Sequence, residues 1–178
     1  LLGGFSNVEV LIAAEQGASA FYLGQKAKAA GIRAVVGGIG GDTLDLGLLK
    51  EPVTLFGNDG DDFLVLASGA YLANNTVDGG SGTDTLAFSI DALSVTDDDF
   101  TRRSDGTADD ALRSVEVLKM ANGNNRVILG ANAQAAGIAT IQGGSGRDTL
   151  DASAFTRALT LDGGQGDNSL FGGSAADS

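Results

Sequence analysis

Glycine-rich turns that return at a nearly constant interval constrain this fold more than any other feature of the sequence. The clearest examples read G-G-I-G-G-D-T-L-D and G-G-S-G-T-D-T-L-A. Full or near matches occupy residues 37–45, 57–65, 79–87, 143–151 and 163–171. Within each of the two groups, successive turns start 20 to 22 residues apart. That interval is typical of the coils of a solenoid, in which each short unit packs only against its neighbours.

A longer repeat contains these turns. The segment V-E-V-L occurs twice, and the residues that follow it also match in order. The two long units cover residues 8–45 and 115–151 and are offset by about 106 residues. We interpret residues 92–114 between them as an insertion. Because neither terminus has the sequence of a cap, we expect residues 1–178 to be one continuous solenoid cut from a larger repeat protein.

Short apolar stretches follow the turns and predict β-strands. Alternation places Leu44 and Leu46 on one face of their strand, and Leu64 and Leu66 on one face of theirs. The 28 glycines, the low aromatic content of 6% and the absence of Trp favour thin layers joined by tight turns. The sequence therefore predicts an all-β fold, a parallel β-solenoid of the β-roll or β-helix type. Helix is expected to be minor, with one short helix capped at residues 96–100.

Charge and composition exclude several classes of function. Acidic residues outnumber basic ones 23 to 11, which argues against nucleic acid as a partner. The chain has no Cys and no His, so it lacks disulfides, thiolate metal sites and the commonest general base. No apolar run is long enough to predict insertion into a membrane. Since the basic residues are also dispersed, we expect no catalytic site and no enzyme activity.

The turn motif G-G-x-G-x-D-x-U-x, where U is a large aliphatic residue, has a direct chemical interpretation. Glycine permits positive φ, so peptide carbonyls can converge on one point. The Asp adds a carboxylate, and stacked turns would surround a site with oxygen atoms, the ligands that calcium prefers. The alternative is that these turns are merely structural.

These residues resemble the nonapeptide repeats of the RTX (repeats-in-toxin) family. The resemblance implies a calcium-loaded parallel β-roll, with carboxylate ligands at Asp42, Asp62, Asp84 and Asp148. The full set of implied metal-site residues is Gly37, Gly38, Gly40, Asp42, Gly57, Asn58, Gly60, Asp62, Gly79, Gly80, Gly82, Asp84, Gly143, Gly144, Gly146, Asp148, Gly163, Gly164, Gly166 and Asn168. Because the motifs mostly come once per coil, the sites are expected to line one edge.

Departures from the motif mark weaker positions. Asn58 replaces the second glycine of its turn, which is tolerable because Asn accepts positive φ. The neutral Asn168 should weaken the fifth site, and the adjacent Asp167 is interpreted as a solvated charge. At the end of the chain Ala175 replaces the third glycine, so Asp177 is a weak candidate.

Two functions remain open at this point. The style of the repeats resembles large secreted bacterial adhesins and S-layer-like proteins, which implies a structural or adhesive module at the cell surface. The alternative is the calcium-dependent carrier region of a secreted protease or lipase, which an H-E-x-x-H or G-x-S-x-G segment in flanking sequence would reveal. The expected partners are calcium, other copies or neighbouring repeats of the same protein, and a cell-surface polysaccharide. The expected location is extracellular.

Overall fold

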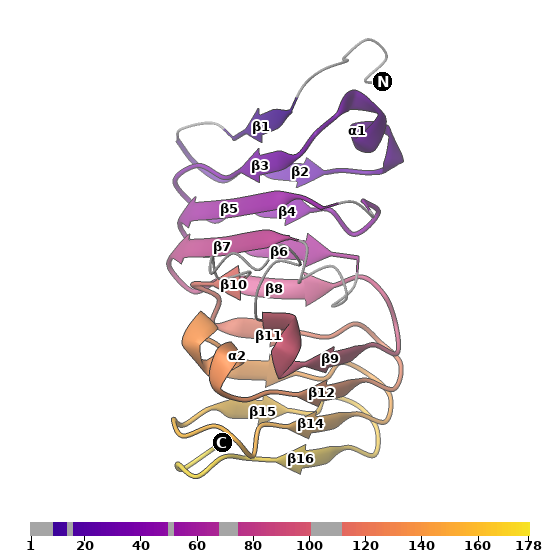
Figure 1. The fold of residues 1–178 in the computed structure, drawn as a ribbon, viewed down its shortest axis with the longest axis vertical. Helices are drawn as coiled ribbons and strands as arrows, with labels where there is room; N and C mark the ends of the chain where they lie inside the picture. Colours follow the sequence, from indigo (N-terminus) through magenta and orange to yellow (C-terminus); the bar gives the residue numbers. More distant parts are fainter. Residues whose placement is uncertain (1–8, 14–15, 50–51, 68–74, 101–111) are drawn as a thin grey trace.

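The chain folds into a parallel β-solenoid (Figure 1), as predicted. The computed structural model describes residues 9–13, 16–49, 52–67, 75–100 and 112–178. Every strand pairing among these residues is parallel and joins one coil to the next. The coils therefore build three sheets, which we call A, B and C.

Sheet B is the longest of the three and runs through most of the solenoid. Sheet A consists of β1 (Val10–Ile12), β3 (Ala34–Val36), β5 (Thr54–Asp59), β7 (Thr76–Ser81) and β10 (Leu112–Arg113). Sheet B consists of β2 (Ala20–Tyr22), β4 (Thr43–Asp45), β6 (Phe63–Leu66), β8 (Thr85–Phe88), β11 (Val117–Lys119), β13 (Thr140–Gln142) and β15 (Thr160–Asp162). Sheet C consists of β9 (Ser94–Thr96), β12 (Arg126–Ile128), β14 (Thr149–Asp151) and β16 (Ser169–Phe171).

Aliphatic ladders inside the solenoid hold the coils together. In sheet B the register partners Leu44, Leu64, Leu86 and Leu118 are all fully buried. Each of these side chains contributes about 1.5–3 kcal/mol by burial. The aliphatic residue of the turn motif thus points into the core, as its alternation predicts. Sheets A and C add the parallel ladders Val35–Leu55–Val77 and Val95–Val127–Leu150.

The two long sequence repeats occupy different sheets. In the first unit and the two coils that follow it, β1 to β8, the strands alternate between sheets A and B. In the second unit and the coil that follows it, β11 to β16, they alternate between sheets B and C. Strands of A and C run to the left in Figure 1 and those of B to the right. Equivalent turns of the two units consequently lie on opposite edges of the solenoid.

Two short helices, which the sequence did not predict, close equivalent coils of the two units. They are α1 (Gln25–Ala30) and α2 (Ala131–Ala136), and each ends at a glycine with positive φ, the usual geometry of a helix C-terminus. Figure 1 places α1 on the right edge and α2 on the left. Among the described residues, no helix is long and apolar enough to cross a membrane.

The segment between the units belongs partly to the solenoid, so the insertion predicted at 92–114 is too wide. Its described residues include β9 of sheet C and β10 of sheet A, because Val95 and Leu112 continue the buried ladders. Residues 101–111 lie outside the described residues. The short helix expected at 96–100 is the 3-10 helix η2 (Asp97–Phe100). The carboxylate of Asp97 accepts hydrogen bonds from the backbone N–H groups of Gly130 and Ala133, at 2.7 and 2.9 Å.

Candidate metal sites at the turns

The predicted site residues lie at the two edges of the solenoid. The turns at 37–42, 57–62 and 79–84 join sheet A to sheet B and form what we call the left edge (Figure 1). The turns at 143–148 and 163–168 join sheet B to sheet C and form the right edge. The prediction of a single edge is therefore wrong for the whole chain, because the second unit begins one sheet later than the first.

A ladder of hydrogen bonds stacks the motif aspartates of the left edge. The backbone N–H of Asp42 donates to Oδ1 of Asp62 at 2.7 Å. The N–H of Asp62 donates in the same way to Oδ1 of Asp84 at 2.8 Å. All three side chains are buried, since none is more than 2% exposed. One oxygen of each carboxylate is therefore used to hold the coils in register.

The second carboxylate oxygen separates the turns into two kinds. Oδ2 of Asp62, Asp84 and Asp148 is buried and has no hydrogen-bond partner. Burying a charged oxygen without a partner is costly, so a cation bound at any of these three atoms would stabilise the fold. In contrast, Oδ2 of Asp42 accepts a hydrogen bond of 2.6 Å from the N–H of Gly38. The first turn thus satisfies its own carboxylate.

In the turns at 37–45, 57–65, 79–87 and 143–151, the first glycine faces the place where oxygen atoms converge. A Cβ built on Gly57 would stand within 3.0 Å of both Asp62 Oδ2 and the carbonyl oxygen of Gly79. A Cβ on Gly37 would likewise meet Asp42 Oδ2 and the carbonyl oxygen of Gly57. Real side chains do not tolerate such contacts. Glycine therefore leaves space between a carboxylate and a carbonyl of the next coil, and these are calcium ligands.

Positive φ angles shape the turns as the motif requires. The third motif glycine has positive φ in every turn, for example 122° at Gly60 and 130° at Gly146. Asn58, which replaces a second glycine, also has a positive φ of 75°. This confirms the prediction that Asn is tolerable there. Its side chain donates to the carbonyl oxygen of Gly37 at 2.7 Å and so ties two turns together.

The stacked carboxylates of the left edge repel one another electrostatically. Burial, together with the charges of Asp84 and Asp42, raises the pKa of Asp62 to about 6, although the hydrogen bond from the N–H of Asp42 lowers it. Burial also raises the pKa of Asp84, and Glu116 is the charge that raises it most. A bound divalent cation would remove this repulsion.

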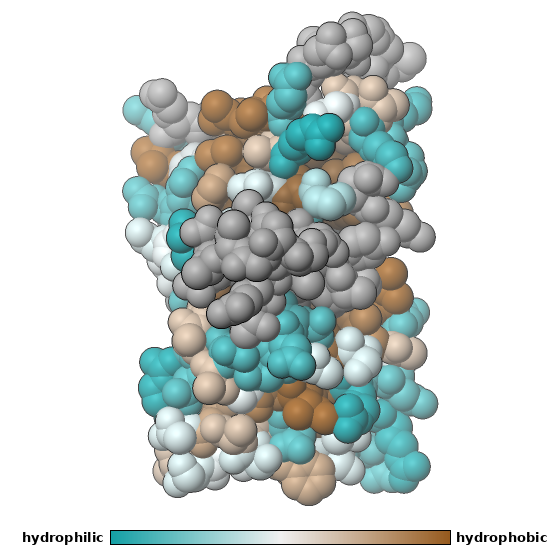
Figure 2. Space-filling model, viewed as in Figure 1, coloured by the Kyte–Doolittle hydropathy of each residue, from teal (hydrophilic) through white to brown (hydrophobic). Residues whose placement is uncertain are grey.

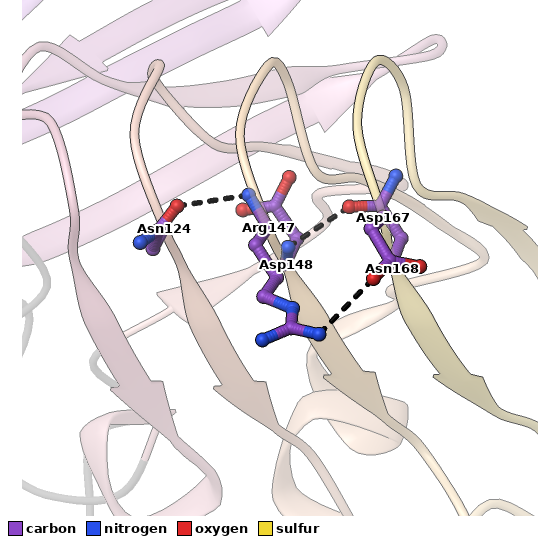
Figure 3. A network of polar contacts seen from close by, with 5 residues as sticks. All are labelled: Asn124, Arg147, Asp148, Asp167 and Asn168. Atoms are coloured by element: carbon purple, nitrogen blue, oxygen red, sulfur yellow. Dashed lines mark hydrogen bonds and ion pairs between the residues drawn. The ribbon is translucent and has the colours of Figure 1, made fainter.

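On the right edge, asparagine amides take positions that aspartate holds on the left. Asn125, Asp148 and Asn168 precede the paired strands β12, β14 and β16. The N–H of Asp148 donates to Oδ1 of Asn168 at 2.9 Å, as Figure 3 shows. The N–H of Asn125 donates to Oδ1 of Asp148 at 2.7 Å. The ladder is therefore preserved where the carboxylate is not.

The amide of Asn125 lies among oxygen atoms that could otherwise surround a cation. Its Nδ2 is 2.9 Å from the carbonyl oxygen of Gly143 and 3.0 Å from Asp148 Oδ1. The carbonyl oxygens of Ala121 and Gly123 lie at 2.8 and 3.1 Å. Because the amide nitrogen carries partial positive charge, Asn125 satisfies these oxygens with the protein's own donor. The sequence alone did not mark this buried residue as part of a site.

Two further acidic residues have the positions expected of them. Asp167 is exposed and forms an ion pair of 3.0 Å with Arg147 (Figure 3), so it is a solvated charge as predicted. Asp177 is exposed, although its Oδ1 accepts a hydrogen bond of 3.1 Å from the N–H of Leu159. A Cβ on Gly172 would approach Asp177 Oδ2, as in the other turns. The last turn therefore keeps the motif geometry at the solvent-exposed end.

The residues present fit calcium better than a metal held by side chains alone. In the described part of the chain, no three acidic or other metal-binding side chains converge on one point. The turns instead offer one carboxylate each, together with several backbone carbonyls. Six to eight oxygen ligands from such mixed sources are typical of calcium. The motif carboxylates and the glycine carbonyls that face them would hold the ion.

Comparison with known families agrees with this chemistry. The family of the RTX calcium-binding nonapeptide repeat matches four stretches of the chain, residues 52–73, 70–86, 135–154 and 160–178. These stretches include all three turns with an unpartnered carboxylate oxygen. They leave out the turn at 37–42, whose carboxylate is satisfied internally. No curated protein and no solved structure matches the chain.

Proposed function

This chain carries RTX calcium-binding nonapeptide repeats and binds calcium, and on that premise we propose that it is a structural or adhesive module of a secreted bacterial surface protein. Its role would be to form a rod that folds when calcium is present outside the cell. RTX repeat proteins are typically secreted. In this proposal the chain performs no catalysis of its own.

The observation that carries the proposal is the set of buried, unpartnered carboxylate oxygens on Asp62, Asp84 and Asp148. Extracellular modules bind calcium at roughly 10⁻⁴ to 10⁻³ M, far above the calcium concentration inside cells. The repulsion among these carboxylates therefore disfavours the folded rod before export. After export, calcium would link each coil to the next.

Association with neighbouring repeats or with other copies of the chain is part of this proposal. Val10 and Ile12 of β1 are 47% and 68% exposed at one end of the rod, where Figure 2 shows apolar surface. Leu170 and Phe171 of β16 are 44% and 52% exposed at the other end. Apolar side chains on terminal coils are suited to stacking against a further coil. A cell-surface polysaccharide is a second candidate partner.

The test compares intact cells of the parent bacterium before and after calcium removal. Antibodies against this chain should label the surface of cells kept in millimolar calcium, and a chelator should release the labelled protein. A parent protein found in the medium together with a co-purifying protease or lipase activity would favour the carrier region of an enzyme instead. A parent protein retained in the cytoplasm would contradict both functions.

A further inference from the structure

We propose that Ser114 and Glu116 complete an additional calcium site with the turn at residues 79–84, at the junction of the two units. Neither residue belongs to a glycine-rich motif, and both lie outside the stretches that match the RTX repeat family. The proposal rests on calcium binding at the neighbouring turns, because it extends the same column by one position.

Glu116 continues the hydrogen-bond ladder of the left edge. Its Oε2 accepts the backbone N–H of Asp84 at 2.8 Å, as Asp84 Oδ1 accepts the N–H of Asp62. The register of β8 and β11 pairs Thr85 with Val117, so Glu116 occupies the position that follows Asp84 in the column. A carboxylate is thus retained at this position although the motif is absent.

Ser114 continues the column of carbonyl oxygens. A Cβ on Gly57 would meet the carbonyl oxygen of Gly79, and a Cβ on Gly79 would meet that of Ser114. The same point above Gly79 lies 2.5 Å from Asp84 Oδ2, a fully buried oxygen with no hydrogen-bond partner. Asp84 therefore directs a free carboxylate oxygen toward the space that Ser114 borders.

The connection at the junction is shorter than a motif turn, which explains why glutamate is used. Arg113 pairs with Asp78 and Val117 with Thr85, so three residues replace the six of the turn at 79–84. Glutamate is one methylene longer than aspartate, and its reach compensates for the missing loop. The positive φ of 52° at Ser114 makes a sharp bend in the backbone. This bend keeps the Ser114 carbonyl in the same column as the carbonyls of Gly57 and Gly79.

The sequence offers a matched control for this site. Glu9 occupies the same position as Glu116 in the two copies of V-E-V-L. Their carbonyl oxygens accept equivalent hydrogen bonds, from Ala34 in one unit and Thr140 in the other. Glu9 is exposed, however, and precedes β1, which among the described residues pairs only with the later strand β3.

The experiment measures calcium stoichiometry by titration calorimetry on the wild type, Glu116→Gln and Glu9→Gln. The Gln variant keeps an oxygen that can accept the N–H of Asp84, so it should fold. We expect Glu116→Gln to bind one calcium ion fewer than the wild type and Glu9→Gln to bind the same number. Equal stoichiometry in all three proteins would overturn the junction site while leaving calcium binding at the repeats intact. A wild type that binds no calcium would overturn both.

A second measurement does not depend on how the variants fold. A crystal structure of the wild type in millimolar calcium should place an ion at about 2.3–2.6 Å from both the Ser114 carbonyl oxygen and a Glu116 carboxylate oxygen. An ion at the turn of residues 57–62 with none beside Ser114 would show that the column ends within the repeats, and would refute the proposal.

Discussion

The side-chain amide of Asn125 donates to Oδ1 of Asp148 at 3.0 Å, and Oδ2 of the same aspartate has no partner. One carboxylate thus has an oxygen satisfied by an amide and another that is left available to a cation. The left edge contains no such amide at the corresponding ladder positions, which are held by Asp62 and Asp84. The two edges should consequently differ in their response to calcium.

Replacing Asn125 by Asp should convert an internally satisfied position into a calcium site. Without calcium, Asn125→Asp should lose about 1–3 kcal/mol of stability, because buried oxygens then face each other without a donor. With calcium, the variant should bind one more ion than the wild type. Thermal melts and calorimetry would measure both effects. Asn124→Asp is the control, since Asn124 is exposed and an Asp there can still accept the N–H of Arg147. If Asn125→Asp bound the same number of calcium ions as the wild type, the amide of Asn125 would not occupy the place of a cation.

Asp62 should contribute more to calcium binding than Asp42 or Asp148. Asp62 lies in the middle of the left column, where its unpartnered oxygen can serve the turns on both sides. We expect Asp62→Asn to lose more calcium than Asp148→Asn, and Asp42→Asn to lose least. In the absence of calcium, Asp62→Asn should melt higher than the wild type because a buried unpaired charge is removed. Equal calcium losses in the three variants would argue against shared ligands along a column.

The calcium-free protein should be more stable at mildly acidic pH than at neutral pH. The pKa of Asp62 is 3.8 for an unperturbed side chain and about 6 in the fold, so folding favours its protonated form. This contribution is complete below pH of about 4 and is lost as the pH rises through 6. In saturating calcium the trend should reverse, because protons compete with the ion. Melting curves in chelator at pH 4.5 and 7, with Asp62→Asn as the comparison, provide the measurement. A melting temperature that rises with pH in chelator would contradict it.

A methyl group at Gly57 should block a site without changing any charge. A Cβ there would occupy the space between Asp62 Oδ2 and the Gly79 carbonyl oxygen. We expect Gly57→Ala to bind less calcium and to lose about 1–3 kcal/mol of stability, the usual cost of overpacking. Gly24→Ala is a suitable control, since the nearest atom to its Cβ is 3.8 Å away. If Gly57→Ala bound calcium like the wild type, the space between Asp62 Oδ2 and the Gly79 carbonyl oxygen would not be a calcium site.

Calcium removal should weaken the whole rod in proportion to the number of occupied sites. For dissociation constants of 10⁻⁴ to 10⁻³ M, about 10 mM calcium stabilises the fold by roughly 1.4–2.7 kcal/mol for each site. Circular dichroism with calcium and with chelator would show the difference as a shift in melting temperature. Identical curves in the two conditions would mean that the turns are structural only.

Much of the fold was predictable from the sequence because the motif is local. The glycines of the turn at 79–84 predict its backbone conformation. Leu86 predicts which face of the following strand points into the core. The helices α1 and α2 were missed because a six-residue helix is unstable alone and forms only against the packed coil.

The change of edge and the roles of Asn125 and Glu116 could not be predicted in the same way. Which sheet a strand joins depends on the number of strands that precede it in the solenoid, including the path through the junction. The sequence repeat looks identical in either register. Asn125 and Glu116 gain their partners from coils 18 to 32 residues away, and no motif spans that distance.

The transfer of the turns from one edge to the other has a mechanical consequence. Calcium ions that draw the coils together along only one edge of a solenoid would shorten that edge and bend the solenoid toward it. Here the first unit is tightened on one side and the second on the other. The two parts of the rod would therefore bend in opposite directions, and the curvature of one would offset that of the other. An array built from this unit could extend without coiling into an arc.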